Sequence, residues 1–323
     1  MTKAIRIHAH GGPEVMRWED VPTPDPGPGE ALVRHAAVGL NYIDVYFRTG
    51  LYKTALPATL GMEAAGTVEA IGPGVTVVAV GDRVAYATAP IGAYSVARVI
   101  AADRLVKLPD NIDFRTAAAM MLQGITAQYL LRRTYKVQPG ETILVHAAAG
   151  GVGLIMCQWA KHLGATVIGV VSTPAKAELA RAHGADHVVV GYADLVAEVK
   201  RFTSGAMVPV VYDSVGKDTF MLGLDCLAPL GMMVSYGNAS GPVGAVEVGL
   251  LGAKGSLFLT RPGLATYTAK RADLERGASD LFEVVGKGVV KIRVNQTFPL
   301  QDAAQAHEAL EARRTTGSTI LLP

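Results

Sequence analysis

The hydrophobic pattern of the chain changes near Phe114. Before that residue, hydrophobic positions form short, loosely alternating segments that clusters of Gly and Pro separate. Alternation of this kind is typical of half-buried strands. The pattern predicts strands at Lys3–Ala9, Glu30–Val38, Ala65–Ile71, Arg83–Ala87 and Tyr94–Ile100. Many short strands between such turns favour a partly open barrel.

After Phe114, strand-like and helix-like segments alternate regularly. Predicted strands lie at Thr142–His146, Thr166–Val171, His187–Val190, Pro209–Asp213, Met232–Tyr236 and Ser256–Thr260. Predicted helices lie between them, at Val152–His162, Pro174–His183, Ala193–Phe202 and Lys217–Cys226. This order indicates an α/β fold with a doubly wound parallel sheet of the Rossmann type.

The change of pattern predicts two domains. We expect residues 1–125 and 263–323 to form the first, catalytic domain, and residues 126–262 to form a dinucleotide-binding domain. Ser256–Thr260 is an apolar strand that comes last in the predicted sheet, and therefore at an edge. Because an exposed apolar edge is covered or paired in native proteins, we expect a homodimer through this strand.

Composition and charge exclude several classes of protein. The chain has 30 Lys and Arg residues against 28 Asp and Glu residues, so we expect neither nucleic acid nor a membrane surface as its partner. Thr142–Ala160 carries no charged residue, but glycines interrupt it, and we expect no membrane span. Only Cys157 and Cys226 are available as thiols, and with no apolar leader at the start of the chain we expect a cytoplasmic protein.

The strongest local motif is the glycine-rich turn that ends at Gly153. It follows a strand-like run and begins a helix-like run, which is the context that a dinucleotide-binding fingerprint requires. Ala148, Gly150 and Gly153 occupy the three glycine positions of that fingerprint. Gly150 would let the backbone approach a pyrophosphate, and Gly153 would let the helix pack closely on the strand. The first turn of the helix would bind the anion.

The end of the second strand of this domain indicates which coenzyme is bound. An NAD-binding fold places an acidic residue there, about 20 residues after the glycines, to hold the ribose hydroxyls. This chain has Ser172, Thr173 and Lys176 instead, which suit a 2′-phosphate and therefore predict NADPH. The alternative interpretation is a helix N-cap followed by a solvated lysine, and the two interpretations are compatible.

Several segments together resemble one enzyme superfamily. The chain resembles the zinc-independent medium-chain dehydrogenases/reductases, and specifically bacterial NADPH:quinone oxidoreductases of the zeta-crystallin type. The resemblance runs nearly end to end and is carried by the glycine-rich turn together with His10–Val15, Asn41–Tyr52, Gly61–Gly66, Gly81–Val84, Val211–Gly216 and Ser235–Gly241. It implies that the barrel domain is GroES-like.

The resemblance also implies site residues. Asn41 and Tyr46 would be catalytic and would lie near the nicotinamide. The residues implied to bind the cofactor are Asn41, Tyr46, Tyr129, Gly150, Gly151, Val152, Gly153, Ser172, Thr173, Lys176, Tyr192, Ser214, Tyr236, Gly237, Asn238, Gly241 and Arg313. The structural alternatives are core packing for Tyr129, a solvated helix end for Arg313, and ordinary packing as wall aromatics for Tyr46 and Tyr52. Asp44 and Arg48 could simply pair one helical turn apart.

No metal is expected. Zinc-dependent members of the superfamily have a Cys near the position of Asn41 and a His where this chain has Met62. An amide and a thioether are poor ligands for Zn²⁺, which needs about three N, S or O ligands from the protein.

The sequence therefore predicts hydride transfer from NADPH to a quinone or a similar conjugated carbonyl compound, with the cofactor supplying the chemistry. One alternative is a reductase of alkenones or enoyl thioesters, because the hydride chemistry is shared. Another is a non-catalytic nucleotide-binding or RNA-binding protein, against which the balanced charge argues. The proton donor to the product is left open between water and Tyr46.

Overall fold

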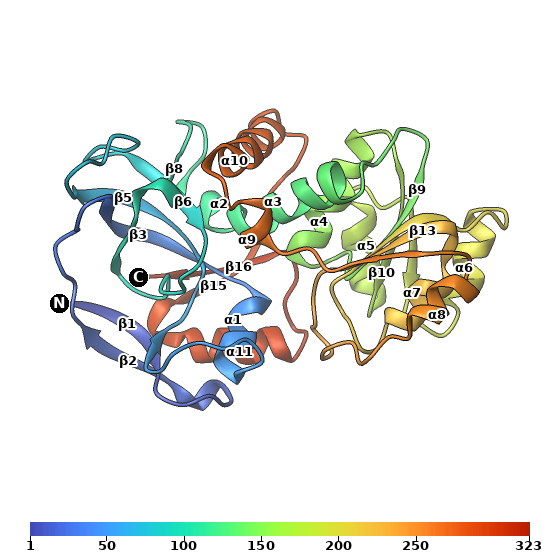
Figure 1. The fold of residues 1–323 in the computed structure, drawn as a ribbon, viewed down its shortest axis with the longest axis horizontal. Helices are drawn as coiled ribbons and strands as arrows, with labels where there is room; N and C mark the ends of the chain where they lie inside the picture. Colours follow the sequence, from blue (N-terminus) through green and yellow to red (C-terminus); the bar gives the residue numbers. More distant parts are fainter. The chain divides into compact units, whose positions relative to one another are not determined.

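The computed structural model describes residues 1–323, which form two compact units (Figure 1). Unit 1 comprises residues 1–125, 268–286 and 292–323, and unit 2 comprises residues 126–267 and 287–291. The sequence-based division placed all of 263–323 in the first domain. In the structure, residues 263–267 and 287–291 belong instead to unit 2.

Unit 1 is built on two β-sheets. The larger has the strand order β15-β16-β3-β5-β6-β8, with β7 also paired to β3, and the smaller has the order β2-β1-β4. These strands are β1 (Thr2–Ile7), β2 (Met16–Val21), β3 (Glu30–Leu40), β4 (Ala58–Thr59), β5 (Glu63–Ile71), β6 (Arg83–Ala87), β7 (Ala97–Ala101), β8 (Val106–Lys107), β15 (Val294–Pro299) and β16 (Ser318–Leu322). The partly open barrel predicted from the turn-rich pattern is thus completed by two strands from the end of the chain.

Strand β3 is the centre of unit 1. It pairs antiparallel with β5, β7 and β16, and its register against β5 shifts twice. Alternate residues such as Ala31 and Val33 enter one hydrophobic core with Ile5 and Tyr94. The helices of unit 1 are α1 (Tyr42–Thr49), α2 (Phe114–Ala118), most of α3 (Met121–Tyr129), α10 (Arg271–Gly286) and α11 (Ala303–Glu311).

Unit 2 is a six-stranded parallel sheet with the strand order β11-β10-β9-β12-β13-β14. Numbered from its first strand this is the order 3-2-1-4-5-6 of the doubly wound dinucleotide fold, so the predicted Rossmann-type class is confirmed. Its strands are β9 (Thr142–His146), β10 (Thr166–Val171), β11 (His187–Val190), β12 (Val208–Asp213), β13 (Leu227–Ser235) and β14 (Phe258–Thr260).

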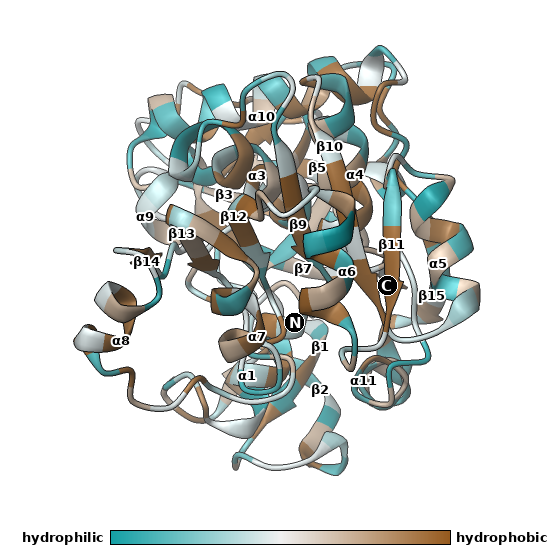
Figure 2. Ribbon diagram, turned by 90° about the vertical axis from the view of Figure 1, so that its right-hand side faces the viewer, coloured by the Kyte–Doolittle hydropathy of each residue, from teal (hydrophilic) through white to brown (hydrophobic).

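The helices of unit 2 are α4 (Gly151–His162), α5 (Pro174–Arg181), α6 (Leu195–Phe202), α7 (Phe220–Asp225), α8 (Val248–Ala253) and α9 (Leu264–Tyr267), and a π-helical turn at Leu130–Thr134 follows α3. Helices α4 to α7 overlap the four predicted helices, whereas α8 and α9 were not predicted. Strands that are buried on both faces read as continuous hydrophobic runs, and Figure 2 shows this hydrophobic colour along the sheet.

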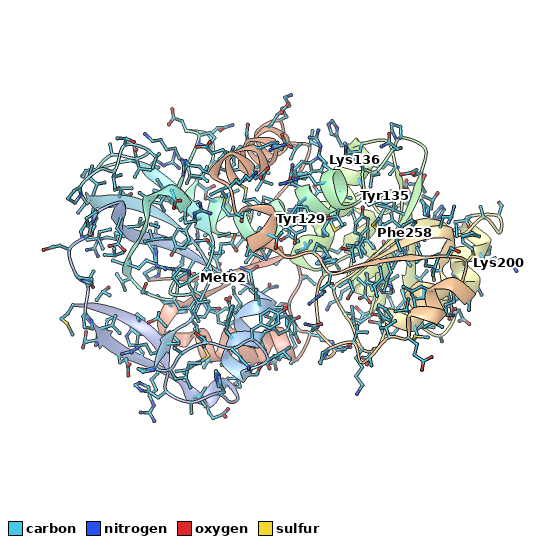
Figure 3. All side chains as sticks on the ribbon, viewed as in Figure 1. Met62, Tyr129, Tyr135, Lys136, Lys200 and Phe258 are labelled. Carbon is cyan, nitrogen blue, oxygen red and sulfur yellow. The ribbon has the colours of Figure 1, made fainter.

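Strand β14 is an edge strand, as its place in the sequence predicted. Its side chains are unusually exposed for a hydrophobic strand: Phe258 is 56% exposed and Leu259 is 39% exposed. Figure 3 labels Phe258 on this outer strand. None of the helices is both long enough and apolar enough to span a bilayer.

Candidate functional site

The glycine-rich turn joins β9 to α4 in unit 2. Ala147 has a left-handed φ of 51°, and Gly150 is the N-cap of α4. A Cβ atom on Gly153 would lie 2.3 Å from the carbonyl oxygen of Ala147 and 2.7 Å from the Cα of Ala148. Only glycine fits there, so the helix begins directly against the end of the strand. Its first N–H groups, from Gly151 and Val152, are then available to an anion.

Ala148, which departs from the fingerprint, is accommodated by its neighbour. A Cβ atom on Gly169 of β10 would come within 2.8 Å of the Ala148 methyl group. The backbone N–H of Ala148 donates to the carbonyl oxygen of Val170, 3.1 Å away. The space that the fingerprint obtains from its first glycine is therefore supplied here by a glycine on the adjacent strand.

The polar segment after β10 starts α5. Thr173 is the N-cap, and its Oγ1 accepts from the backbone N–H of Lys176 at 3.3 Å. Pro174 occupies the first helical position, so the N-cap interpretation is confirmed, with Thr173 as the cap. Ser172 is exposed at the end of the strand, and Lys176 is half-buried in the first turn. No acidic residue stands in this first turn.

Two loops at the carboxyl ends of β12 and β13 are bonded together. The carboxylate of Asp213 accepts from the backbone N–H groups of Val215 and Gly216, and from the hydroxyl of Thr219. Further backbone bonds join the second loop to the first: Tyr236 N–H to Asp213 O at 2.7 Å, Ala239 N–H to Ser214 O at 3.2 Å, Ser240 N–H to Val215 O at 2.8 Å and Lys217 N–H to Gly241 O at 3.1 Å.

Close approach of these loops requires glycine. A Cβ atom on Gly237 would lie 2.3 Å from the Ser214 carbonyl oxygen. Arg261, which follows β14, donates from Nη1 to the carbonyl oxygen of Ser235 at 2.8 Å and to that of Gly237 at 3.3 Å. The predicted residues Ser214, Tyr236, Gly237, Asn238 and Gly241 thus form one fixed surface at the carboxyl edge of the sheet.

Aromatic side chains of unit 2 also pair. The ring of Tyr129 stacks on that of Tyr267, with centroids 4.3 Å apart and planes 12° apart. Another predicted tyrosine, Tyr192, lies near His146 at the end of β9, with ring centroids 6.3 Å apart. Tyr129, labelled in Figure 3, is almost fully buried, and burial raises its pKa to about 12.

In unit 1, Asn41 is the single residue between strand β3 and helix α1. It is the N-cap of α1 and is 5% exposed. Its Nδ2 donates to Oε2 of Glu63 at 2.6 Å, and its Oδ1 accepts from Nε2 of Gln123 at 3.2 Å. Burial raises the pKa of Glu63 to about 8, against the opposing effect of the bonds from Asn41 and Leu122.

Tyr46 lies on α1 among other tyrosines. Its ring centroid is 5.2 Å from that of Tyr52 and 5.6 Å from that of Tyr42. Arg313 is close to the same helix. Burial raises the pKa of Tyr42, the first residue of α1, and the positive charge of Arg313 lowers it. Unit 1 therefore brings Asn41, Tyr46 and Arg313 to one short helix, α1.

The expected pairing of Asp44 with Arg48 along α1 is wrong. Asp44 accepts from the backbone N–H of Asn41 at 2.9 Å and from the hydroxyl of Tyr94 at 3.0 Å. Arg48 turns to the C-terminal helix, where it donates to both carboxylate oxygens of Glu311 at 2.9 Å. The reason is burial: Asp44 and Arg48 are both enclosed, and each finds partners on elements that pack over α1.

His307 connects these partners. Its Nδ1 lies 3.0 Å from Arg48 Nη1, and its Nε2 lies 3.0 Å from the Tyr94 hydroxyl. Burial and the nearby Arg48 charge lower the pKa of His307 to about 3. Burial raises the pKa of Asp44 to about 7. A hydrogen-bonded chain thus fixes α1, which carries Asn41 and Tyr46, to α11.

The residues at the expected zinc-ligand positions do not fit a zinc ion. Asn41 and Glu63 are bonded to each other, and the residue before Glu63 is Met62, labelled in Figure 3, whose buried thioether is a poor zinc ligand. No three His, Cys, Asp or Glu side chains of the chain come together in an arrangement that could hold a metal.

Sequence reasoning missed Glu63, Gln123, Arg261 and Tyr267. Glu63 lies within the Gly61–Gly66 segment that carries the resemblance, but it was given no role. Arg261 directly follows a predicted strand. A charged residue at the carboxyl end of a parallel strand was a signal that could have identified Arg261. Gln123 and Tyr267 had no such signal, because their partners are distant in sequence.

Two family descriptions match the chain. Residues 27–192 match the family described as "Alcohol dehydrogenase GroES-like domain", and residues 151–262 match the one described as "Zinc-binding dehydrogenase". A quinone oxidoreductase from Pseudomonas aeruginosa is 55% identical over 325 residues, which cover 100% of both chains. A 2-haloacrylate reductase from a Burkholderia species is 47% identical over 334 residues, which cover 100% of this chain and 99% of that protein.

The solved structures agree with these relatives. The structure of Escherichia coli quinone oxidoreductase complexed with NADPH is similar with a TM-score of 0.97 at 49% identity. The match covers 99% of this chain and 100% of that one.

Proposed function

The chain belongs to the quinone oxidoreductases of the medium-chain dehydrogenase/reductase superfamily, and on this premise we propose that it is an NADPH-dependent quinone reductase. One observation carries the proposal: a glycine-rich turn, which has no room for a side chain at Gly153, leads into helix α4 at the carboxyl edge of a doubly wound sheet. The relative with which NADPH has been crystallised shares this fold over its whole length.

The residues of unit 2 fit the cofactor. The first turn of α4 would hold the pyrophosphate, and the joined loops after β12 and β13 would form the adjoining wall. We assign cofactor binding in this unit to Tyr129, Gly150, Gly151, Val152, Gly153, Ser172, Thr173, Lys176, Tyr192, Ser214, Tyr236, Gly237, Asn238 and Gly241.

The coenzyme phosphate is assigned to the start of α5. Thr173 uses its side-chain oxygen for the cap, yet its hydroxyl hydrogen is available to an anion, and Ser172 is exposed beside it. Lys176 adds a positive charge in the first helical turn, and no carboxylate there would repel a phosphate. This chemistry favours NADPH over NADH.

We assign Asn41 and Tyr46 to the nicotinamide and the acceptor, and Arg313 to a supporting cofactor contact. NADPH, when bound, supplies the hydride. The protein then has to orient a planar acceptor and exclude water, for which the tyrosines around Tyr46 offer flat apolar walls. The product takes its proton from water or from Tyr46. Since the donor set at Asn41 and Glu63 does not fit zinc, no step depends on a metal.

A comparison of acceptors tests the proposal. The loss of NADPH absorbance would be followed with 1,4-benzoquinone, an alkenone and an enoyl thioester. We expect the highest kcat/KM with the quinone. A clear preference for an enoyl thioester or an alkenone would replace quinone reductase by the second candidate, which the 2-haloacrylate reductase relative supports. NADPH binding without turnover of any acceptor would favour a non-catalytic role.

We also propose a cytoplasmic homodimer. The support for the dimer is the exposed edge strand β14, where Phe258 and Leu259 would pair with their copies about a two-fold axis. The support for the compartment is that both cysteines are free and buried. The mass in solution by light scattering tests the dimer, and Leu259→Lys should shift that mass to the monomer.

A further inference from the structure

Four buried side chains of unit 1 form one line of hydrogen bonds. Ser318 of β16 donates from Oγ to Gln123 Oε1 at 2.7 Å, and Gln123 of α3 donates from Nε2 to Asn41 Oδ1 at 3.2 Å. Asn41 then donates from Nδ2 to Glu63 Oε2 at 2.6 Å. All four side chains are buried, so water does not compete for these bonds.

Every bond in the line has the same direction, and Glu63 sets that direction. Its two oxygens both meet donors, namely Asn41 Nδ2 and the backbone N–H of Leu122 at 2.8 Å. When Glu63 is ionised, Asn41 must therefore present its nitrogen to Glu63, which leaves its oxygen for Gln123. Gln123 in turn must present its nitrogen to Asn41 and its oxygen to Ser318.

The carboxyl group of Glu63 is held in place by its surroundings. A Cβ atom on Gly39 would lie 2.4 Å from Glu63 Oε2 and 2.2 Å from the Ala118 carbonyl oxygen. Glycine at position 39 thus lets the carboxyl group lie directly against β3. Any larger residue at position 39 would displace the carboxyl group that sets the direction of the line.

We propose that Glu63 and Gln123 are positioning residues that fix which end of the Asn41 carboxamide faces the reacting groups. This inference rests on the proposed function. With one N–H of Asn41 bonded to Glu63, the second N–H remains as a donor. On the proposed function this N–H would donate to the acceptor oxygen that gains negative charge when the hydride is transferred, where an oriented donor accelerates the reaction.

Glu63→Gln provides the sharpest test, because the whole line can reverse without losing a bond. The carboxamide introduced at position 63 would donate to Asn41 Oδ1, Asn41 to Gln123 Oε1, and Gln123 to Ser318 Oγ. Ser318 would then donate to the Ala119 carbonyl oxygen, which already lies 2.9 Å from its Oγ. The hydrogen bonds of the line would be kept, whereas the two ends of the Asn41 carboxamide would exchange places.

The matched control is Glu141→Gln. Glu141 also accepts from one side chain, the Tyr135 hydroxyl at 2.7 Å, and from one backbone N–H, that of Gln138 at 2.8 Å. It precedes β9 at the amino end of the parallel sheet, opposite to the cofactor edge. The chemical change is identical, and only the place differs.

With NADPH and 1,4-benzoquinone at about pH 9, where Glu63 is ionised, we expect Glu63→Gln to lower kcat about ten- to a hundredfold. The KM for NADPH and the Tm should stay close to wild type, and Glu141→Gln should keep full kcat. At about pH 6 wild-type Glu63 carries a proton and can donate as the carboxamide of the variant does, so the ratio of the two kcat values should shrink. The other titratable groups around Glu63 are Asp44, Tyr86 and Tyr94, and both proteins retain them.

The outcomes separate the inference from the proposed function. An active wild type with full kcat in Glu63→Gln at about pH 9 overturns the inference alone. If Glu63→Gln does not fold, Gln123→Met tests the inference in its place, because it removes the donor to Asn41 Oδ1. An unchanged kcat in Gln123→Met overturns the inference as well. A wild type that reduces none of the three acceptors instead refutes the proposed function.

Discussion

Two buried carboxyl groups should make the protein less stable as the pH rises from neutral to mildly alkaline values. Burial raises the pKa of Asp44 from 3.8 to about 7 and that of Glu63 from 4.5 to about 8. Between the lower and the higher value of each group, the folded protein holds a proton that the unfolded chain has lost. The folded state binds more protons, so the free energy of unfolding falls as the pH rises.

The magnitude follows from these values. Each group that is protonated in the folded state but not in the unfolded state lowers the free energy of unfolding by about 1.4 kcal/mol for every unit by which the pH rises. From pH 6.5 to 7 both carboxyl groups contribute, and from 7 to 8 Glu63 alone does. The summed loss between pH 6.5 and 8 is about 2–3 kcal/mol.

Buried histidines oppose this trend only at lower pH. Burial lowers the pKa of His35 from 6.5 to about 4 and that of His307 from 6.5 to about 3. Below pH 6.5 the unfolded chain therefore binds more protons at these groups, and their contribution to stability rises with pH, opposite to that of the two carboxyl groups. Above that pH both histidines are neutral in both states. Because the two histidines offset the two carboxyl groups below this pH, the two effects together predict a free energy of unfolding that changes little up to about pH 6.5 and falls above it.

Urea unfolding followed by circular dichroism at several pH values between about 6 and 8.5 would measure this curve. Glu63→Gln removes one of the two groups, so its stability should be nearly constant from pH 7 to 8, while Glu141→Gln should keep the wild-type decline. A wild type whose stability is flat or rising over this interval would refute the reasoning, and so would an undiminished decline in Glu63→Gln.

Three further predictions concern single residues. Lys176→Ala should weaken NADPH binding about 10- to 150-fold in fluorescence titrations, because it removes one charge-assisted contact with the 2′-phosphate, and NADH binding should be nearly unchanged. Equal weakening of both coenzymes would show that Lys176 is only a solvated helix residue. Gly153→Ala should lower both Tm and NADPH affinity, since its Cβ would meet backbone at 2.3 Å, whereas Gly252→Ala in α8 has open space and should not lower Tm. Arg48→Leu should cost about 3–5 kcal/mol in urea unfolding, because it breaks a buried ion pair, against less than about 1 kcal/mol for the exposed Arg181→Leu.

The sequence was most informative where structure is local. The six strands of unit 2 were predicted with the correct order along the chain, because each is a hydrophobic run followed by a turn and an amphipathic helix. In unit 1 the strand β2 and the helices α2 and α3 were not predicted, and α1 was anticipated only through the helical spacing of Asp44 and Arg48. Met16–Val21 alternates poorly, and α1 is only 8 residues long, so neither has a periodic pattern of its own. Pairing with β1 and packing against α11 give them their structure instead.

The polar interior of unit 1 could not be predicted in the same way. The residue pairs that form the line from Ser318 to Glu63 are 195, 82 and 22 positions apart. No spacing rule connects such residues, because only the folded sheet brings β16, α3 and β5 together. The wrong pairing of Asp44 with Arg48 has the same origin. A helical spacing of four predicts a contact on an exposed surface, but on a buried helix the neighbouring elements determine the partners.

Whether a residue that departs from a sequence motif is tolerated therefore depends on which atoms its side chain would contact. The fingerprint asks for glycine at the position of Ala148, and by residue type the motif is incomplete. The structure shows that the requirement is for room between the turn and the next strand, and Gly169 supplies it from the other side. By contrast, the room at Gly153 is bounded by the backbone of Ala147 and Ala148, which no change elsewhere can move cheaply. The two positions of one motif thus differ in tolerance, because one borders a side chain and the other borders the main chain.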